Sequence, residues 1–183
     1  TKYRQLLRIE AVDRRRRRVR RMERGREFAI YLVAYSACPA CADALMRLQP
    51  FHQVDDTPFS ARRADVERAR GAPMRIDHDP IGLTALDYGD VVYRFQDGTG
   101  RLEEVTRRAP MLYLVLPGGV ADVPFGALAA FVRSHDDDVF TRAGFLVSPR
   151  MGLAFVPAEP DWVTALAPHC IASWRGMDAG STA

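Results

Sequence analysis

Residues 27–48 combine three features that together predict a redox-active α/β fold. The apolar, β-prone run Phe28-Ala29-Ile30-Tyr31-Leu32-Val33-Ala34-Tyr35 leads into Cys38-Pro39-Ala40-Cys41, and the helix-like stretch 42–48 follows directly. A run this apolar is typical of an inner strand that is covered on both faces. Two cysteines at this spacing lie within disulfide reach across one helical turn, and unpaired N–H groups at a helix start favour a thiolate on Cys38. We therefore expect Cys38 to act as a nucleophile and Cys41 as the resolving thiol.

The charge of the chain is concentrated at its beginning. Residues 1–26 carry twelve Lys or Arg against three acidic residues, a net charge of +9, whereas the whole chain of 183 residues carries only +3. The remainder is therefore acidic, at −6. The segment Arg14–Arg26 is the densest part of this basic arm, and apolar residues recur at helical steps over 3–24. Such an arm favours contact with nucleic acid or an anionic lipid surface, although a solvated helix face is the simpler interpretation.

Two further interpretations of the cysteines stay open. Cys38 and Cys41 would form a Cys₃His zinc site together with His169 and Cys170, although adjacent residues seldom ligate one metal ion comfortably. Alternatively, Tyr35-Ser36-Ala37-Cys38 after an apolar run resembles a bacterial lipoprotein signal. Outside such a site, Cys170 is expected to be a buried apolar residue. The dithiol is the favoured interpretation, and with it we expect no metal and no cofactor.

Local patterns predict further elements along the chain. Helices are expected from about Pro39 to Gln49, in the region 60–70, over 124–133 and over 162–167. Strands are expected at 74–76, 91–95, 101–105, 111–116, 120–123, 144–147 and 152–156, with hairpins closed by the turns at 97–100 and 148–151.

The order strand, Cys-x-x-Cys, helix, proline-led strand, strand and helix resembles the thioredoxin-like superfamily over residues 27–135. Cys38-Pro39-Ala40-Cys41 matches its active-site motif, and Ala109-Pro110-Met111 matches the loop that carries a cis-proline opposite that motif. The resemblance implies an α/β fold, a mixed sheet flanked by helices, in which the backbone at Ala109 and Pro110 binds an extended substrate. The long stretch between the two motifs and the Arg-rich lead helix also resemble thioredoxin-like proteins of bacterial conjugative-transfer systems and integrating elements.

These expectations divide the chain into a basic helical arm at 1–26, a thioredoxin-like domain at 27–135 with an insertion at about 51–108, and a C-terminal extension at 136–183. The expected function is thiol–disulfide exchange on protein disulfides, in which Cys38 attacks and Cys41 resolves the mixed disulfide. The alternative is a non-catalytic scaffold or assembly component of a conjugative DNA-transfer or secretion system. A periplasmic or membrane-associated location is favoured over a cytoplasmic one. The chain has no phosphate-binding glycine loop and no dinucleotide fingerprint, which argues against nucleotide-driven chemistry.

Overall fold

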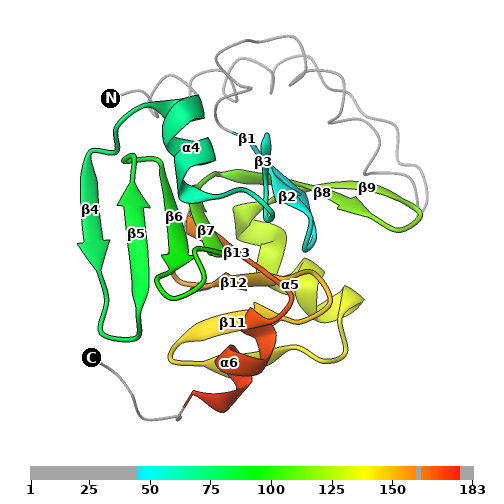
Figure 1. The fold of residues 1–183 in the computed structure, drawn as a ribbon. Helices are drawn as coiled ribbons and strands as arrows, with labels where there is room; N and C mark the ends of the chain where they lie inside the picture. Colours follow the sequence, from blue (N-terminus) through cyan, green and yellow to red (C-terminus); the bar gives the residue numbers. More distant parts are fainter. Residues whose placement is uncertain (1–44, 160–161, 178–183) are drawn as a thin grey trace, which may run out of the picture. The chain divides into compact units, whose positions relative to one another are not determined.

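The computed structural model describes residues 45–159 and 162–177. All described residues belong to one compact unit, Tyr35–Ala183. Their secondary structure is mostly β. Among the described residues, thirteen strands form a five-stranded and an eight-stranded sheet, and three short helices accompany them (Figure 1).

The five-stranded sheet has the order β3-β2-β1-β8-β9. Its strands are β1 (Leu45–Gln49), β2 (Gln53–Val54), β3 (Thr57–Pro58), β8 (Met111–Leu116) and β9 (Gly119–Pro124). Strands β1 and β8 run parallel, with Met46 opposite Leu112 and Leu48 opposite Leu114, and all other pairs are antiparallel. These four side chains are fully buried, or nearly so. The period-2 alternation of apolar residues thus gives this sheet one core-facing side.

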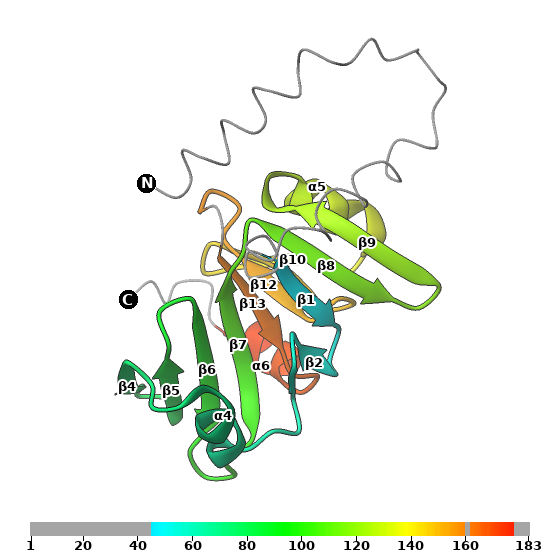
Figure 2. The ribbon, with the colours of Figure 1, turned by 90° about the horizontal axis from the view of Figure 1, so that it is seen from above.

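The eight-stranded sheet is antiparallel throughout and has the order β10-β11-β12-β13-β7-β6-β5-β4. Its strands are β4 (Arg75–His78), β5 (Leu83–Asp87), β6 (Val91–Gln96), β7 (Leu102–Arg108), β10 (Phe140–Arg142), β11 (Phe145–Ser148), β12 (Leu153–Phe155) and β13 (Trp162–Leu166). The turn that joins β6 to β7 ends at Gly100, whose φ of 64° favours glycine. Figure 2 shows β4 to β7 side by side in chain order.

The two faces of the eight-stranded sheet differ in their surroundings. On β6, Val91, Tyr93 and Phe95 are buried, whereas the alternate positions, including Arg94, are only half-buried. The buried residues belong to one hydrophobic cluster with Met46 and the other core residues of the five-stranded sheet. One face of the larger sheet therefore packs into the core, and the opposite face is left to form a site.

The helices complete this core at two places. Helix α4 (Arg63–Arg70) buries Val66, and helix α5 (Phe125–His135) buries Phe125, Leu128 and Val132 in the main cluster. Helix α6 (Cys170–Gly176) contributes Cys170 and Trp174 to a second, smaller cluster. That cluster also contains buried residues of β11, β12 and β13, so α6 packs against this end of the eight-stranded sheet (Figure 1).

The predicted thioredoxin-like α/β fold is wrong. A thioredoxin-like sheet needs helices on its faces and a helix directly after Cys41, but the segment predicted as a helix from 39 to 49 contains strand β1 at its end. Its pairing with β8 and β2 overrides a helical pattern that was only a few residues long. The helix predicted over 162–167 is also wrong, because these residues form β13 between β12 and β7. The strands predicted between residues 74 and 156, and the helices near 63–70 and 125–135, are confirmed. The inner strand predicted over 28–35 lies outside the described residues.

The proline-led strand is present without the feature that the resemblance implied. Pro110 precedes β8, and its carbonyl accepts a hydrogen bond of 2.9 Å from the backbone N–H of Phe125. No peptide bond among the described residues is cis, so the predicted cis-proline at Pro110 is wrong. In the same residues, no helix combines the length and the apolar character that a membrane crossing requires. The predicted domain boundaries stay predictions, although β7 and β13, from either side of residue 135, pair in one sheet.

Candidate functional site

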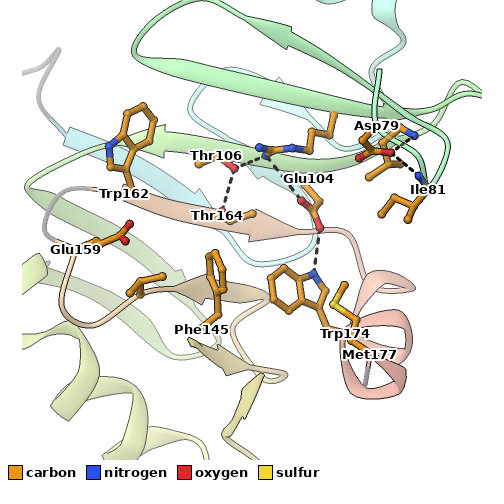
Figure 3. Close-up of a pocket in the computed structure, with 13 residues that line it drawn as sticks. Asp79, Ile81, Glu104, Thr106, Phe145, Glu159, Trp162, Thr164, Trp174 and Met177 are labelled. Atoms are coloured by element: carbon orange, nitrogen blue, oxygen red, sulfur yellow. Dashed lines mark hydrogen bonds and ion pairs between the residues drawn. The ribbon is translucent and has the colours of Figure 1, made fainter. Parts of the chain in front are cut away.

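A groove with a volume of about 370 Å³ lies on the half-exposed face of the eight-stranded sheet (Figure 3). Its floor comes from alternate positions of β5, β6, β7 and β13, which project to the same side of the sheet because side chains alternate along a strand. Its remaining lining comes from the start of β11, helix α6 and the loops around Asp79 and Glu159. Thirteen residues line it: Asp79, Ile81, Leu83, Arg94, Glu104, Thr106, Phe145, Val156, Glu159, Trp162, Thr164, Trp174 and Met177.

A polar network crosses the floor of the groove. Arg94 and Glu104 are opposite each other on β6 and β7, and Thr106 is opposite Thr164 on β13. The Arg94 guanidinium donates a hydrogen bond of 2.7 Å to Thr106 Oγ1 and lies 3.8 Å from a Glu104 carboxylate oxygen. The hydroxyls of Thr106 and Thr164 are 2.9 Å apart. Strand register therefore fixes these four side chains as two neighbouring pairs on one face of the sheet, which makes the floor preorganised.

Trp174 connects helix α6 to this polar network. Its indole Nε1 donates a hydrogen bond of 3.1 Å to Glu104 Oε1, and its ring contacts Phe145 edge-to-face at a centroid distance of 5.3 Å. Burial raises the pKa of Glu104, while the Arg94 guanidinium and the Trp174 hydrogen bond act in the opposite direction. Glu104 is thus held by groups on a neighbouring strand and on α6, and it joins the floor of the groove to its aromatic wall.

The groove is acidic and aromatic. Its lining contains three carboxylates and one cation, a net formal charge of −2 when all are ionised. Arg94 faces Glu104, so the excess charge belongs to Asp79 and Glu159, which lie on opposite sides of the groove in Figure 3. Trp162 and Trp174, the only tryptophans of the chain, both line it. Aromatic faces and carboxylates are the two groups that attract organic cations.

A larger cavity, of about 740 Å³, lies elsewhere and makes a weaker candidate. Its lining comes mostly from connections, among them the β1–β2 and β8–β9 turns, and it includes the scattered histidines His52 and His135. The charged side chains that line it are Asp137 and Arg150, one of each sign. Nothing in this lining favours one charge or one chemical class of ligand.

None of the described residues that the sequence predicted as site residues lines the groove. Cys38, Pro39, Ala40 and Cys41 lie outside the described residues, as does the Arg14–Arg26 arm. Ala109, predicted to bind substrate, is 1% exposed, and Pro110 is half-buried. Neither Ala109 nor Pro110 lines the groove.

His169 and Cys170, predicted as members of a zinc set with Cys38 and Cys41, do lie together with a third residue. Glu103, at the start of β7, faces both: Cys170 Sγ is 3.1 Å from Glu103 Oε2, and His169 Nε2 contacts the same oxygen. Cys170 is buried, as predicted. Burial and the neighbouring Glu103 raise the pKa of its thiol well above the ordinary value, so this thiol is a poor free nucleophile.

Comparison of the chain with protein-family models, with curated proteins and with solved structures finds no match. The groove must therefore be interpreted from its own chemistry.

Sequence patterns alone missed the groove. The local patterns predict Arg94 and Glu104 only as parts of strands, and Trp162 as part of a helix. The sequence signal that bears on the groove is its two tryptophans, which the structure places in one lining. That signal cannot be interpreted without the strand order that brings β13 beside β7.

Proposed function

We propose that the groove binds a small organic cation of the aliphatic amine class. The observation that carries this proposal is the pairing of two tryptophans and a phenylalanine with an excess of carboxylates in one groove of about 370 Å³. That volume is within the usual range for small-ligand sites. The tryptophan faces would attract an ammonium group by about 0.5–2 kcal/mol each, depending on how far water is excluded.

The lining favours binding over catalysis. Among the thirteen lining residues there is no Cys, His, Ser, Lys or Tyr. Burial raises the pKa of the lining carboxyl Glu104, and this side chain is held by Arg94 and Trp174. The two hydroxyls of the lining, Thr106 and Thr164, are bonded to each other and to Arg94 and not to a base that would activate a nucleophile. The groove is therefore assigned the role of a recognition site.

The placement of the two excess carboxylates favours a ligand with charge at both ends. Asp79 Oδ1 accepts hydrogen bonds from the backbone N–H groups of Ile81 and Leu83, which fixes the carboxylate at one side of the groove. Glu159 lies at the other side (Figure 3). A linear diamine would pair one ammonium with each carboxylate and place its methylene chain against the aromatic rings.

Tryptophan fluorescence tests this proposal directly, because both tryptophans of the chain line the groove. We would titrate the full chain with cadaverine, with its monoamine analogue pentylamine and with pentanediol, which share one chain length and differ in charge. The expected order of affinity is diamine, then monoamine, then diol, with the diamine weakened by added salt. Equal affinities for the three probes, or no fluorescence change with any of them, would refute cation recognition.

Two variants locate the binding. Glu159→Gln and Asp79→Asn each remove one of the excess carboxylates, and each is expected to reduce diamine affinity toward that of the monoamine. Asp137→Asn, in the other cavity, is the matched control and should leave the affinity unchanged. If the control variant weakens binding as much as the groove variants, the ligand sits elsewhere.

A second candidate function rests on the Cys38-Pro39-Ala40-Cys41 sequence. We propose that this pair carries out thiol–disulfide exchange with protein substrates, a role that the spacing of two cysteines supports independently of the fold. An oxidising periplasmic or membrane-associated location would suit it. Titration of the pair against glutathione, read by alkylation and mass, should give a defined two-electron potential that Cys41→Ser abolishes. A pair that shows no exchange would favour the scaffold alternative.

A further inference from the structure

We propose that Glu103, His169 and Cys170 form a zinc site that needs neither Cys38 nor Cys41. Glu103 belongs to β7, His169 precedes helix α6 and Cys170 begins it. None of the three lines the groove. Their ligand atoms, one from each residue, all lie within 4.8 Å of one another. This inference is independent of cation binding in the groove.

The geometry suits a small tetrahedral ion. With zinc bonds of about 2.0–2.3 Å to oxygen, nitrogen and sulfur, the ligand atoms of a tetrahedral site are roughly 3.3–3.6 Å apart. Cys170 Sγ is 3.1 Å from Glu103 Oε2, and His169 Nε2 approaches the same oxygen from the helix start. Small side-chain rotations would therefore bring all three atoms to bonding distance of one ion.

A backbone hydrogen bond holds the segment that carries His169 and Cys170 beside Glu103. The backbone N–H of Ala167 donates a hydrogen bond of 2.8 Å to the Glu103 carbonyl, which joins the chain before α6 to β7. Because His169 precedes the helix and Cys170 begins it, the two adjacent side chains reach the same carboxylate. The objection that neighbouring residues seldom ligate one ion does not apply to this geometry.

Glu103 supplies an independent indication that a ligand belongs there. The residue is 7% exposed, and its Oε1 is buried without a hydrogen-bond partner among the described residues. The Arg101 guanidinium forms an ion pair with this oxygen, with its Nε 3.4 Å away, but donates no hydrogen bond to it. Burial of a carboxylate oxygen that accepts no hydrogen bond is costly, and a divalent cation bound by both Glu103 oxygens would satisfy Oε1 together with the Oε2 that faces His169 and Cys170.

The ligand set selects the metal by its chemistry. A thiolate, an imidazole and a carboxylate together suit zinc, whereas magnesium and calcium prefer oxygen ligands. Metal binding would replace the thiol proton of Cys170. A cavity of about 300 Å³, lined by Arg101 and His169 among others, adjoins the cluster and gives room for entry and for a water as fourth ligand.

The test uses the full chain with Cys38→Ser and Cys41→Ser, so that Cys170 is its one cysteine. Titration with cobalt(II), the usual spectroscopic substitute for zinc, should give a thiolate-to-cobalt charge-transfer band and the visible absorption of tetrahedral cobalt, which zinc then removes at one equivalent. Absence of cobalt binding in this background, or binding without the thiolate band, would overturn the proposal.

Three variants in the same background assign the ligands. Cys170→Ser should abolish the charge-transfer band, whereas His169→Gln and Glu103→Gln should keep it and weaken binding by at least about tenfold. His78→Gln removes an exposed histidine outside the cluster and should leave binding unchanged. His169 is exposed, so its variant is expected to fold even if Cys170→Ser does not. Unchanged affinity in a folded His169→Gln protein would overturn the proposed ligand set.

Discussion

Replacement of Trp174 by Phe should destabilise the protein far more than the same replacement at Trp162. Trp174 is 8% exposed and donates a hydrogen bond of 3.1 Å to Glu104, while its ring packs edge-to-face on Phe145. Phenylalanine keeps an aromatic ring there but removes the donor. Trp162 is half-buried and has no hydrogen bond from its indole N–H to another described residue.

The size of the effect follows from these contacts. Loss of a hydrogen bond to a charged group costs about 1.5–3 kcal/mol. The smaller ring leaves unfilled volume in the second hydrophobic cluster, which adds about 1 kcal/mol. We therefore expect Trp174→Phe to lower the free energy of unfolding by about 2.5–4 kcal/mol, and Trp162→Phe by less than about 1 kcal/mol.

The measurement is chemical denaturation followed by far-ultraviolet circular dichroism, because tryptophan fluorescence changes with both variants. Equal losses at the two positions would refute the reasoning, since of the two tryptophans it is Trp174 that donates a hydrogen bond to Glu104. A loss at Trp174 below about 1 kcal/mol would show that the hydrogen bond to Glu104 contributes little net stability. Both folded variants should bind the diamine more weakly, because phenylalanine attracts cations less than tryptophan does.

Four further outcomes are expected. Burial raises the folded-state pKa of Glu104 above its ordinary 4.5. The stability that this shift contributes is therefore fully present below pH 4.5 and is lost as the pH rises through the folded-state pKa. Relative to wild type, Glu104→Gln should gain stability from acid to neutral pH in parallel urea titrations. Asp136→Ala should lower the free energy of unfolding by about 3–5 kcal/mol in denaturant melts. Its buried carboxylate accepts hydrogen bonds from Ser148 Oγ at 2.6 Å and from two backbone N–H groups at 2.9 Å. The control Asp138→Ala, at an exposed position, should lower it by less than about 0.5 kcal/mol. Cys170, with its raised pKa and buried thiol, should resist iodoacetamide in the native protein and react after unfolding, and rapid native alkylation would contradict its burial. Deletion of residues 1–26 should abolish any salt-sensitive retardation on DNA, and a salt-insensitive shift or an unchanged one would exclude the basic arm as the cause.

Local signals predicted those elements whose stability depends on neighbouring residues. The hairpin of β6 and β7 combines alternating apolar positions with the turn Asp97–Gly100, and both can be recognised without knowledge of the rest of the chain. The same holds for the hairpin of β11 and β12 and for α5, whose apolar residues recur at helical spacing. In each case the partner is the next segment, so the sequence window contains the whole pattern.

The errors occurred where the partner is distant. Leu45–Gln49 can be read as the end of a helix or as an alternating strand, and its pairing with β8, over sixty residues later, makes it a strand. Trp162–Leu166 likewise becomes a strand because β7 and β12 lie on its two sides. Once β1 is a strand, the expected order of a thioredoxin-like domain no longer fits, even though the Cys-x-x-Cys and proline-led segments are present in the sequence.

The amino-acid sequence by itself determined the basic arm, the dithiol motif and the local hairpins, because charge, spacing and alternation are properties of neighbouring residues. Only the tertiary structure decided the functional surfaces. The groove needs Arg94, Glu104 and Thr164 from three strands that are neighbours in the sheet but not all neighbours in sequence. The proposed zinc site needs Glu103 beside Cys170, sixty-seven residues later. Strand pairing joined these residues, because the hydrogen bonds and buried apolar area that fix the register outweigh the short-range preferences of the segments that carry them.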